Sequence, residues 1–215
     1  MNNRPSFLKN TKKKICLICE GYEEYDYISR LLELGVCADV YDFTLVNAES
    51  CGNISARYQD RYQSDDFDIV FAFCDTDRRP EDGFELIRTK INKIFGNEIA
   101  AEKVIIFVNP CTMQVILSHF GDVNLRTQNK KKNNPEIVRL TGLKSDKCYD
   151  GCKEHRDFIF SKITLENYVE MKKRISELST IYTDNPSTNF KYFLDLFESS
   201  DTKWIDDINK QIESE

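Results

Sequence analysis

The chain has 215 residues, of which 40% are hydrophobic and 31% charged, and its formal net charge is −6. This composition is that of a soluble globular protein, and no window approaches the roughly 18 apolar residues of a membrane helix. The negative charge argues against bulk electrostatic coating of nucleic acid, although basic stretches at 9–14 and 126–134 leave local patches open. Because the N-terminal stretch lacks the apolar core of a signal peptide, we expect a cytoplasmic protein with no membrane attachment.

The first half of the chain alternates strand and helix patterns in the way that parallel sheets are built. The apolar strand runs are uninterrupted, which is typical of a sheet covered by helices on both faces. The pattern predicts strands at 14–20, 41–49, 67–75 and 103–109, and helices at 23–35, 54–63 and 83–96. We therefore expect an α/β fold with a Rossmann-like, four-stranded parallel sheet.

The second half has a different character. It predicts helices at 112–121, 150–160, 165–178 and 188–198, a polar loop around the lysine run at 126–134, and a frayed acidic end after about Asp201. We expect two parts: a core at 1–110 and a helical C-terminal lobe at 111–215 packed on that core.

Three acidic residues follow predicted strands. Glu20 ends the first strand, and Asp75 and Asp77 end the third. The carboxyl ends of parallel strands share one edge of a sheet, which is where ligands bind in such folds. Two carboxylates in an Asp-x-Asp pair repel each other unless a cation intervenes, and Mg²⁺ prefers such hard oxygen ligands. We expect these three side chains to hold a divalent ion.

The residues around these acids add detail. Gly21 allows a sharp turn after Glu20, and Glu24 then lies at the start of the following helix, where it is a further candidate metal ligand. Ordinary helix-start chemistry is the alternative explanation for Glu24, because acidic side chains favour the helix dipole there. Arg78 and Arg79, directly after the acidic pair, are candidates to hold phosphate oxygens.

The eight cysteines do not indicate a disulfide scaffold, because several lie inside apolar strand runs and are better explained as reduced core thiols. Cys148, Cys152 and His155 have a spacing that one helical turn could bring together as a zinc site. A fourth ligand is not evident, and the usual paired Cys-x-x-Cys is absent.

Asp-x-Asp after an apolar strand occurs in haloacid-dehalogenase phosphatases, in nucleotide-sugar glycosyltransferases and in Toprim domains. A strand ending in Glu-Gly, followed two units later by a strand ending in Asp-x-Asp, resembles Toprim. The segments CEGYEEYDYISRLL (19–32), NPCTMQVILSHF (109–120) and NPSTNFKYFLDLF (185–197) resemble motifs of RloB-like proteins, a Toprim group near the OLD-family nucleases. A lysine-bearing segment, GLKSDKCYDG (142–151), is a further candidate match.

This resemblance implies a Toprim-like core and a metal-dependent nuclease that cleaves DNA or RNA with Mg²⁺ or Mn²⁺. It also implies a role in bacterial or phage defence, with nucleic acid as a partner and an ATPase or a second copy of the chain as further candidates. The implied roles are a proton-transferring Glu20, metal ligands at Asp75 and Asp77, and a second-metal ligand at Glu24. The implied substrate-contacting residues, besides the two arginines, are Asn109, His119, Lys144 and Lys147.

Some residues depart from the family pattern. Met113 and Val115 stand where RloB-like proteins have Glu and Trp. A catalytically inactive Toprim-fold subunit that binds nucleic acid, a nucleotide or an ATPase is therefore the alternative, and a phosphatase of small phosphate esters is a third hypothesis. His119 is also explained as a core histidine, and the two lysines as solvated side chains.

Overall fold

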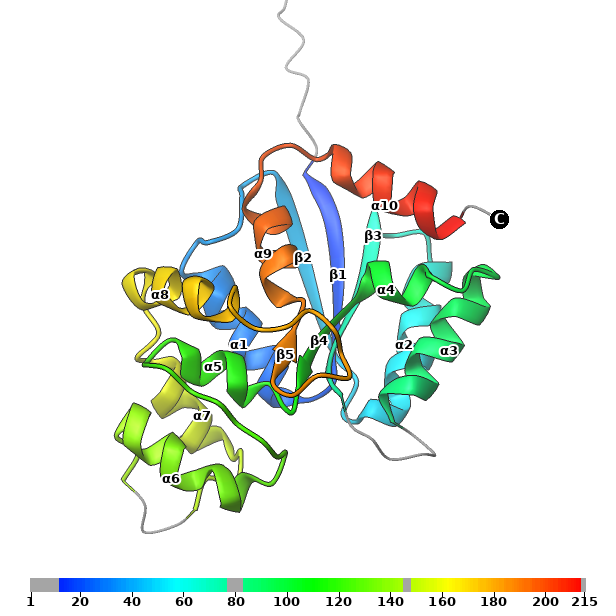
Figure 1. Ribbon diagram of the computed structural model, residues 1–215. Coiled ribbons are helices and arrows are strands. Elements are labelled where there is room, and N and C mark those ends of the chain that lie inside the picture. The colour runs from blue at the N-terminus through cyan, green and yellow to red at the C-terminus, as the bar shows by residue number, and fades with distance from the viewer. Residues whose placement is uncertain (1–11, 77–82, 145–147, 214–215) are drawn as a thin grey trace, which may run out of the picture.

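The structure is a computed structural model that describes residues 12–76, 83–144 and 148–213. Its centre is a five-stranded sheet in the order β2-β1-β3-β4-β5 (Figure 1). The first four strands are parallel, and β5 runs antiparallel to β4. The strands are β1 (Lys13–Cys19), β2 (Tyr41–Asn47), β3 (Ile69–Asp75), β4 (Ile105–Asn109) and β5 (Ser187–Thr188). The predicted α/β fold with a parallel sheet is confirmed, with one additional strand.

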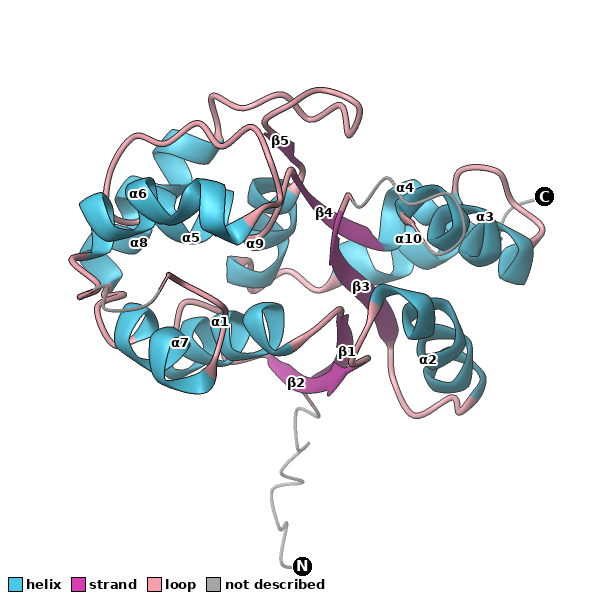
Figure 2. Cartoon of the chain, turned by 90° about the horizontal axis from the view of Figure 1, so that it is seen from below, coloured by secondary structure: helices cyan, strands magenta, loops and turns pink. Residues whose placement is uncertain are grey.

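Helices cover both faces of the sheet, as its apolar strands require. Figure 2, which looks along the strands from below, shows α1 and α9 on one side of the sheet and α2 and α3 on the other. The helices of the first half are α1 (Tyr22–Glu33), α2 (Cys51–Gln63), α3 (Phe84–Phe95) and α4 (Ala100–Val104). Those of the second half are α5 (Met113–Ser118), α6 (Lys130–Thr141), α7 (Lys153–Phe160), α8 (Leu165–Ile175), α9 (Phe190–Glu198) and α10 (Lys203–Glu213).

The order of the strands positions the candidate site. β1 pairs with β3 along Ile15–Cys19 and Ile69–Phe73, so the two strands that carry the predicted acidic residues are neighbours. The five residues from Ile15 to Cys19 are fully buried, and six of the seven residues of β3 are buried. This burial holds the two carboxyl ends firmly at the same edge, which is the lower edge in Figure 1.

The end of the chain returns to the sheet. The ring of Phe190 in α9 stacks on Phe73 of β3, with centroids 5.2 Å apart. Residues after Asp201 form α10, so the prediction of a frayed end is wrong. Ile205, Ile208 and Ile212 recur at helical spacing and are buried. α10 lies where the strands begin, and Asn209 donates a hydrogen bond of 2.9 Å to the Asp68 carbonyl just before β3 (Figure 1).

Helices α5 to α7 gather beside the lower, carboxyl edge of the sheet in Figure 1, and α8 lies above them, in contact with α5 and α9. The prediction of a polar loop through the lysine run is wrong for residues 130–134, which begin α6. The Asn129 side chain caps this helix by accepting a hydrogen bond of 3.1 Å from the Lys132 amide. A domain boundary at residue 110 stays a prediction. Among the described residues, no helix is long and apolar enough to cross a membrane.

Candidate active site

Two of the predicted acidic residues meet at the carboxyl edge of the sheet. Oε2 of Glu20 accepts a hydrogen bond of 3.0 Å from the backbone amide of Asp75, across 55 residues of sequence. The Glu20 amide in turn donates to the Phe73 carbonyl at 3.0 Å, which extends the pairing of β1 and β3 by one residue. The two carboxylates are therefore placed by the backbone of neighbouring strands. Asp77, Arg78 and Arg79 lie outside the described residues.

Glu24 joins this group from the first turn of α1. Its Oε2 accepts a hydrogen bond of 3.0 Å from the Gly21 amide, which closes the turn between β1 and α1. The residue is only 5% exposed. A Cβ on Gly21 would lie 3.5 Å from the same oxygen, an ordinary van der Waals contact. The helix-start explanation of Glu24 thus accounts for one hydrogen bond, but burial of an acidic side chain is costly and points to a further role.

Thr112, the N-cap residue of α5, also binds Asp75. Its backbone amide and its hydroxyl both donate to Oδ1 of Asp75, at 2.6 and 2.8 Å. Thr112 therefore orients the Asp75 carboxylate through two hydrogen bonds. Both hydrogen bonds that the Asp75 carboxylate accepts within the described part of the chain go to Oδ1.

A fourth acidic residue, Glu23, accepts hydrogen bonds from the side chains of Lys130 and Tyr149. Its Oε2 accepts from Nζ of Lys130 at 2.9 Å and from the hydroxyl of Tyr149 at 2.7 Å. Burial lowers the pKa of Lys130, but the charge of Glu23 and its hydrogen bond outweigh this effect, so the pKa is raised overall. Lys130 therefore stays charged and neutralises part of the acidic edge.

The remaining carboxylates are electrostatically strained. Burial raises the pKa of Asp75 well above its ordinary value, and the charges of Glu24 and Glu20 raise it further, against the lowering effect of Thr112. Burial likewise raises the pKa of Glu24, with a further contribution from Glu23. These groups either share protons or bind a cation, since several negative charges in a poorly solvated site repel one another.

The donor set fits a hard divalent ion. Carboxylate oxygens are the ligands that Mg²⁺ and Mn²⁺ prefer, and Mg²⁺ commonly takes one or two of them together with water. Ligand atoms of Glu20, Glu24 and Asp75 do not all lie within 4.8 Å of one another in the part of the chain that is described. In this arrangement the three carboxylates would thus not all contact one ion directly. Thr76, next to Asp75, has a buried hydroxyl that has no hydrogen-bond partner among the described residues.

Two other predicted residues are buried in structural roles. Nε2 of His119 lies 2.9 Å from the Tyr27 hydroxyl, and Nδ1 lies 3.0 Å from Oδ1 of Asn167. Because an amide oxygen only accepts, Nδ1 carries the proton and Nε2 accepts from the tyrosine. Burial lowers the pKa of His119 to about 4. Asn109 is 3% exposed and donates to the carbonyls of Tyr182 and Asp184.

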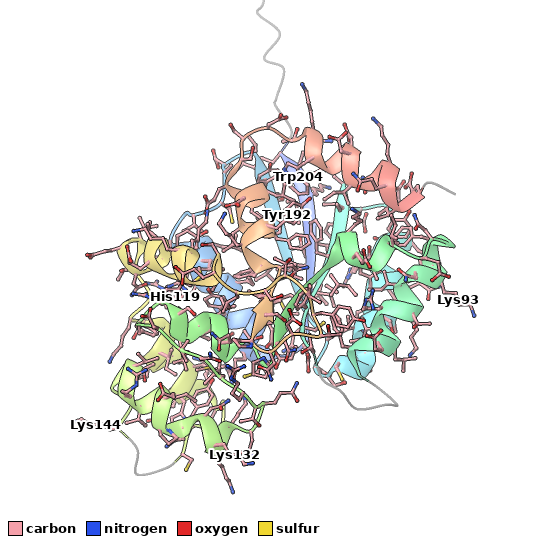
Figure 3. All side chains as sticks on the ribbon, viewed as in Figure 1. Lys93, His119, Lys132, Lys144, Tyr192 and Trp204 are labelled. Carbon is pink, nitrogen blue, oxygen red and sulfur yellow. The ribbon has the colours of Figure 1, made fainter. Side chains whose placement is uncertain are left out.

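The two predicted lysines, Lys144 and Lys147, follow α6 in the sequence. Lys144 is exposed, and in Figure 3 it lies at the lower left of the molecule. Lys147 lies outside the described residues. Met113 and Val115 are buried, at 1% and 0% exposure, so neither position supplies a polar group to the site.

Sequence reasoning missed Thr112, Lys130 and Tyr149. Each contacts an acidic residue from a segment 37 to 126 residues away. Lys130 belongs to the basic stretch that was interpreted as a solvated loop. Asn129, a typical N-cap residue, indicates that a helix begins at Lys130. No local pattern indicates that Lys130 pairs with Glu23.

Comparison with protein-family models, with curated proteins and with solved structures gave no match. The arrangement of the acidic edge is therefore the basis on which a function can be proposed.

Proposed function

We propose that this protein is a Toprim-like, metal-dependent nuclease of the RloB-like group that hydrolyses phosphodiester bonds in nucleic acid. A role in bacterial or phage defence, alone or with an ATPase partner, follows from the same resemblance. The observation that carries the proposal is the hydrogen bond between Glu20 and the Asp75 amide at the ends of adjacent parallel strands. Ligand sites of open parallel sheets lie at this edge.

The electrostatics of the edge supports the same function. Glu20, Glu24 and Asp75 converge on a region in which burial and mutual repulsion raise the pKa values of Asp75 and Glu24. Such a region attracts a divalent ion and, through the ion, a phosphate group. A polyanionic substrate would otherwise be repelled, so a cation is needed for a nucleic acid to approach.

Each residue has a proposed role. Asp75, held by Thr112 on Oδ1, would bind the ion together with Asp77 and Glu24. Glu20 would accept a proton from the attacking water. The hydrogen bond from the Asp75 amide fixes the position of the Glu20 carboxylate for this role. A bound Mg²⁺ or Mn²⁺ supplies charge stabilisation and a more acidic water. Arg78 and Arg79 remain candidates for binding phosphate oxygens.

The test is a nuclease assay on single- and double-stranded DNA and RNA with Mg²⁺ or Mn²⁺, with and without a candidate ATPase. Asp75→Asn and Glu20→Gln each keep the shape of the side chain, and each should lower the rate by about 100-fold or more. Asp68→Asn is the matched control, because Asp68 precedes the opposite end of the same strand and pairs with Lys13. It should leave the rate unchanged. A wild-type protein that cleaves none of these substrates while binding them refutes the proposal.

One observation favours a second function, that of an inactive subunit. Met113 is buried where RloB-like proteins have Glu, so whatever metal binding or substrate orientation that Glu provides in the family is missing here. An inactive Toprim-fold subunit would bind nucleic acid, a nucleotide or an ATPase without cleavage. Mn²⁺ titration separates the two functions. Binding that Asp75→Asn abolishes supports the nuclease, whereas weak binding that this substitution leaves unchanged supports the inactive subunit.

A further inference from the structure

The loop before α7 gathers three different metal-binding side chains. Asp150, Cys152 and His155 each offer one ligand atom, and these atoms all lie within 4.8 Å of one another. Oδ1 of Asp150 lies 3.0 Å from Nδ1 of His155 and accepts a hydrogen bond of 2.9 Å from the Cys152 amide. No other such group of three occurs among the residues that the structure describes.

We propose that Asp150, Cys152 and His155 bind a zinc-class transition-metal ion, with water at the fourth position. A carboxylate oxygen, a thiolate sulfur and an imidazole nitrogen together are a donor set that Zn²⁺ accepts. Zinc–ligand bonds of about 2.0–2.3 Å place the ligand atoms of a tetrahedral ion roughly 3.3–3.8 Å apart. The observed spacing therefore requires only small rotations of side chains.

The backbone that carries the ligands is already anchored. The Tyr149 amide donates to the Asn134 side chain at 2.8 Å, and Arg156 donates to the Gly151 carbonyl. Arg156 is itself held by an ion pair of 2.7 Å with Asp26. Gly151 has a φ of 77°, which allows the tight turn between the first two ligands. Because the backbone at Tyr149 and Gly151 is held in place, binding an ion next to it costs little ordering entropy.

An ion can reach this group from solvent. Asp150 and Cys152 are exposed, and His155 is half-buried with its ring stacked on Tyr149 at 5.8 Å. The set differs from the one that the cysteine spacing suggested. Cys148 is exposed nearby in sequence but is not a member of the group, and Asp150 is the third ligand instead.

The proposed site is separate from the acidic edge, but Tyr149 connects the two. Its ring stacks on His155, and its hydroxyl donates to Glu23 at 2.7 Å. An ion bound by His155 would therefore hold Tyr149 against Glu23. The proposal does not depend on nuclease activity, and its test measures binding alone.

The experiment uses the full chain, freed of metal with a chelator and titrated with Co²⁺ as a spectroscopic probe for Zn²⁺. Binding through Cys152 produces a thiolate-to-cobalt charge-transfer band in the near ultraviolet, which Zn²⁺ then abolishes by displacement. Co²⁺ held only by carboxylates at the acidic edge gives no such band. Cys152→Ser should lose the band. Asp150→Asn and His155→Ala should each weaken Co²⁺ binding by at least about tenfold.

Cys148→Ser is the matched control, because it removes the neighbouring exposed thiol. It should keep both the band and the affinity of the wild-type protein. Asp150→Asn retains the oxygen that accepts from the Cys152 amide, so the turn is preserved, and far-ultraviolet circular dichroism checks the fold of every variant. The proposal is overturned if the wild-type protein gives no thiolate band. It is equally overturned if Cys152→Ser keeps the band or Cys148→Ser loses it.

Discussion

The ion pair between Glu23 and Lys130 allows a quantitative test of the electrostatics of the acidic edge. The Glu23 side chain is 11% exposed, whereas that of Lys130 is 43% exposed, and the charged atoms are 2.9 Å apart. Lys130→Met removes the charge and keeps most of the apolar stem. The Glu23 carboxylate is then left with the Tyr149 hydroxyl as its remaining partner among these contacts.

The expected magnitude lies between two limits. Exposed ion pairs contribute about 0.2–1 kcal/mol, whereas removing one partner from a buried pair costs about 3–5 kcal/mol. Solvent screens the half-exposed Lys130, and Tyr149 continues to satisfy Glu23. We therefore expect Lys130→Met to lower the free energy of unfolding by about 1–2 kcal/mol. Glu23→Gln in the same chain should restore about 1 kcal/mol of this loss, because the uncharged amide needs no counter-charge.

The assay is urea unfolding of the four proteins of this double-mutant cycle, in the presence of a chelator. With a slope of about 2 kcal/mol per M, Lys130→Met should lower the midpoint by about 0.5–1 M. Lys132→Met, on the same helix and exposed, is the matched control and should change stability by less than about 0.5 kcal/mol. A coupling energy below about 0.3 kcal/mol, or an equal loss in the control, would refute the reasoning.

Three further predictions concern single groups. Tyr149→Phe keeps the buried ring but removes the hydrogen bond to Glu23, so unfolding free energy should fall by about 1–2 kcal/mol in chemical denaturation, and an unchanged value contradicts the bond. Because the pKa of Asp75 is raised in the folded state, its stabilising contribution is present below the ordinary value of 3.8 and is lost as pH rises through the folded pKa. Without metal, the free energy of unfolding of Asp75→Asn should therefore rise relative to that of the wild type as pH rises, until the folded pKa of Asp75 is passed. A difference between the two proteins that stays constant between pH 5 and 8 argues against the raised pKa. His119, whose pKa is lowered to about 4, should remain neutral in NMR titrations down to about pH 5, and its contribution to stability should be lost as pH falls from 6.5 toward 4.

The meeting of Glu20 and Asp75 was predictable from local patterns. Both residues follow apolar runs that only a buried parallel strand explains, and parallel strands end at a common edge. The order of the strands was not predictable in detail, but any arrangement that makes β1 and β3 neighbours brings these two residues together.

The errors in the sequence interpretation have identifiable causes. α6 buries Asn133, Ile137 and Thr141, so two of its three buried positions are polar and no apolar stripe marks the helix. α10 does carry a stripe of isoleucines, but the acidic residues around it favoured a frayed end. β5 has only two residues and is created by its pairing with β4. Such a strand has no periodic pattern of its own.

The amino-acid sequence by itself determined the α/β class, the buried strands and the edge of the sheet, at the carboxyl ends of the strands, where Glu20 and Asp75 lie. These features depend on the burial of apolar residues and on strand geometry, which repeat over short distances along the chain. Only the tertiary structure decided which groups surround the carboxylates. Thr112, Lys130 and Tyr149 reach them across 37, 107 and 126 residues, through the packing of α5, α6 and the segment before α7 beside the sheet edge. No local pattern encodes these contacts, because each depends on the relative placement of two elements that the chain connects only by a long path.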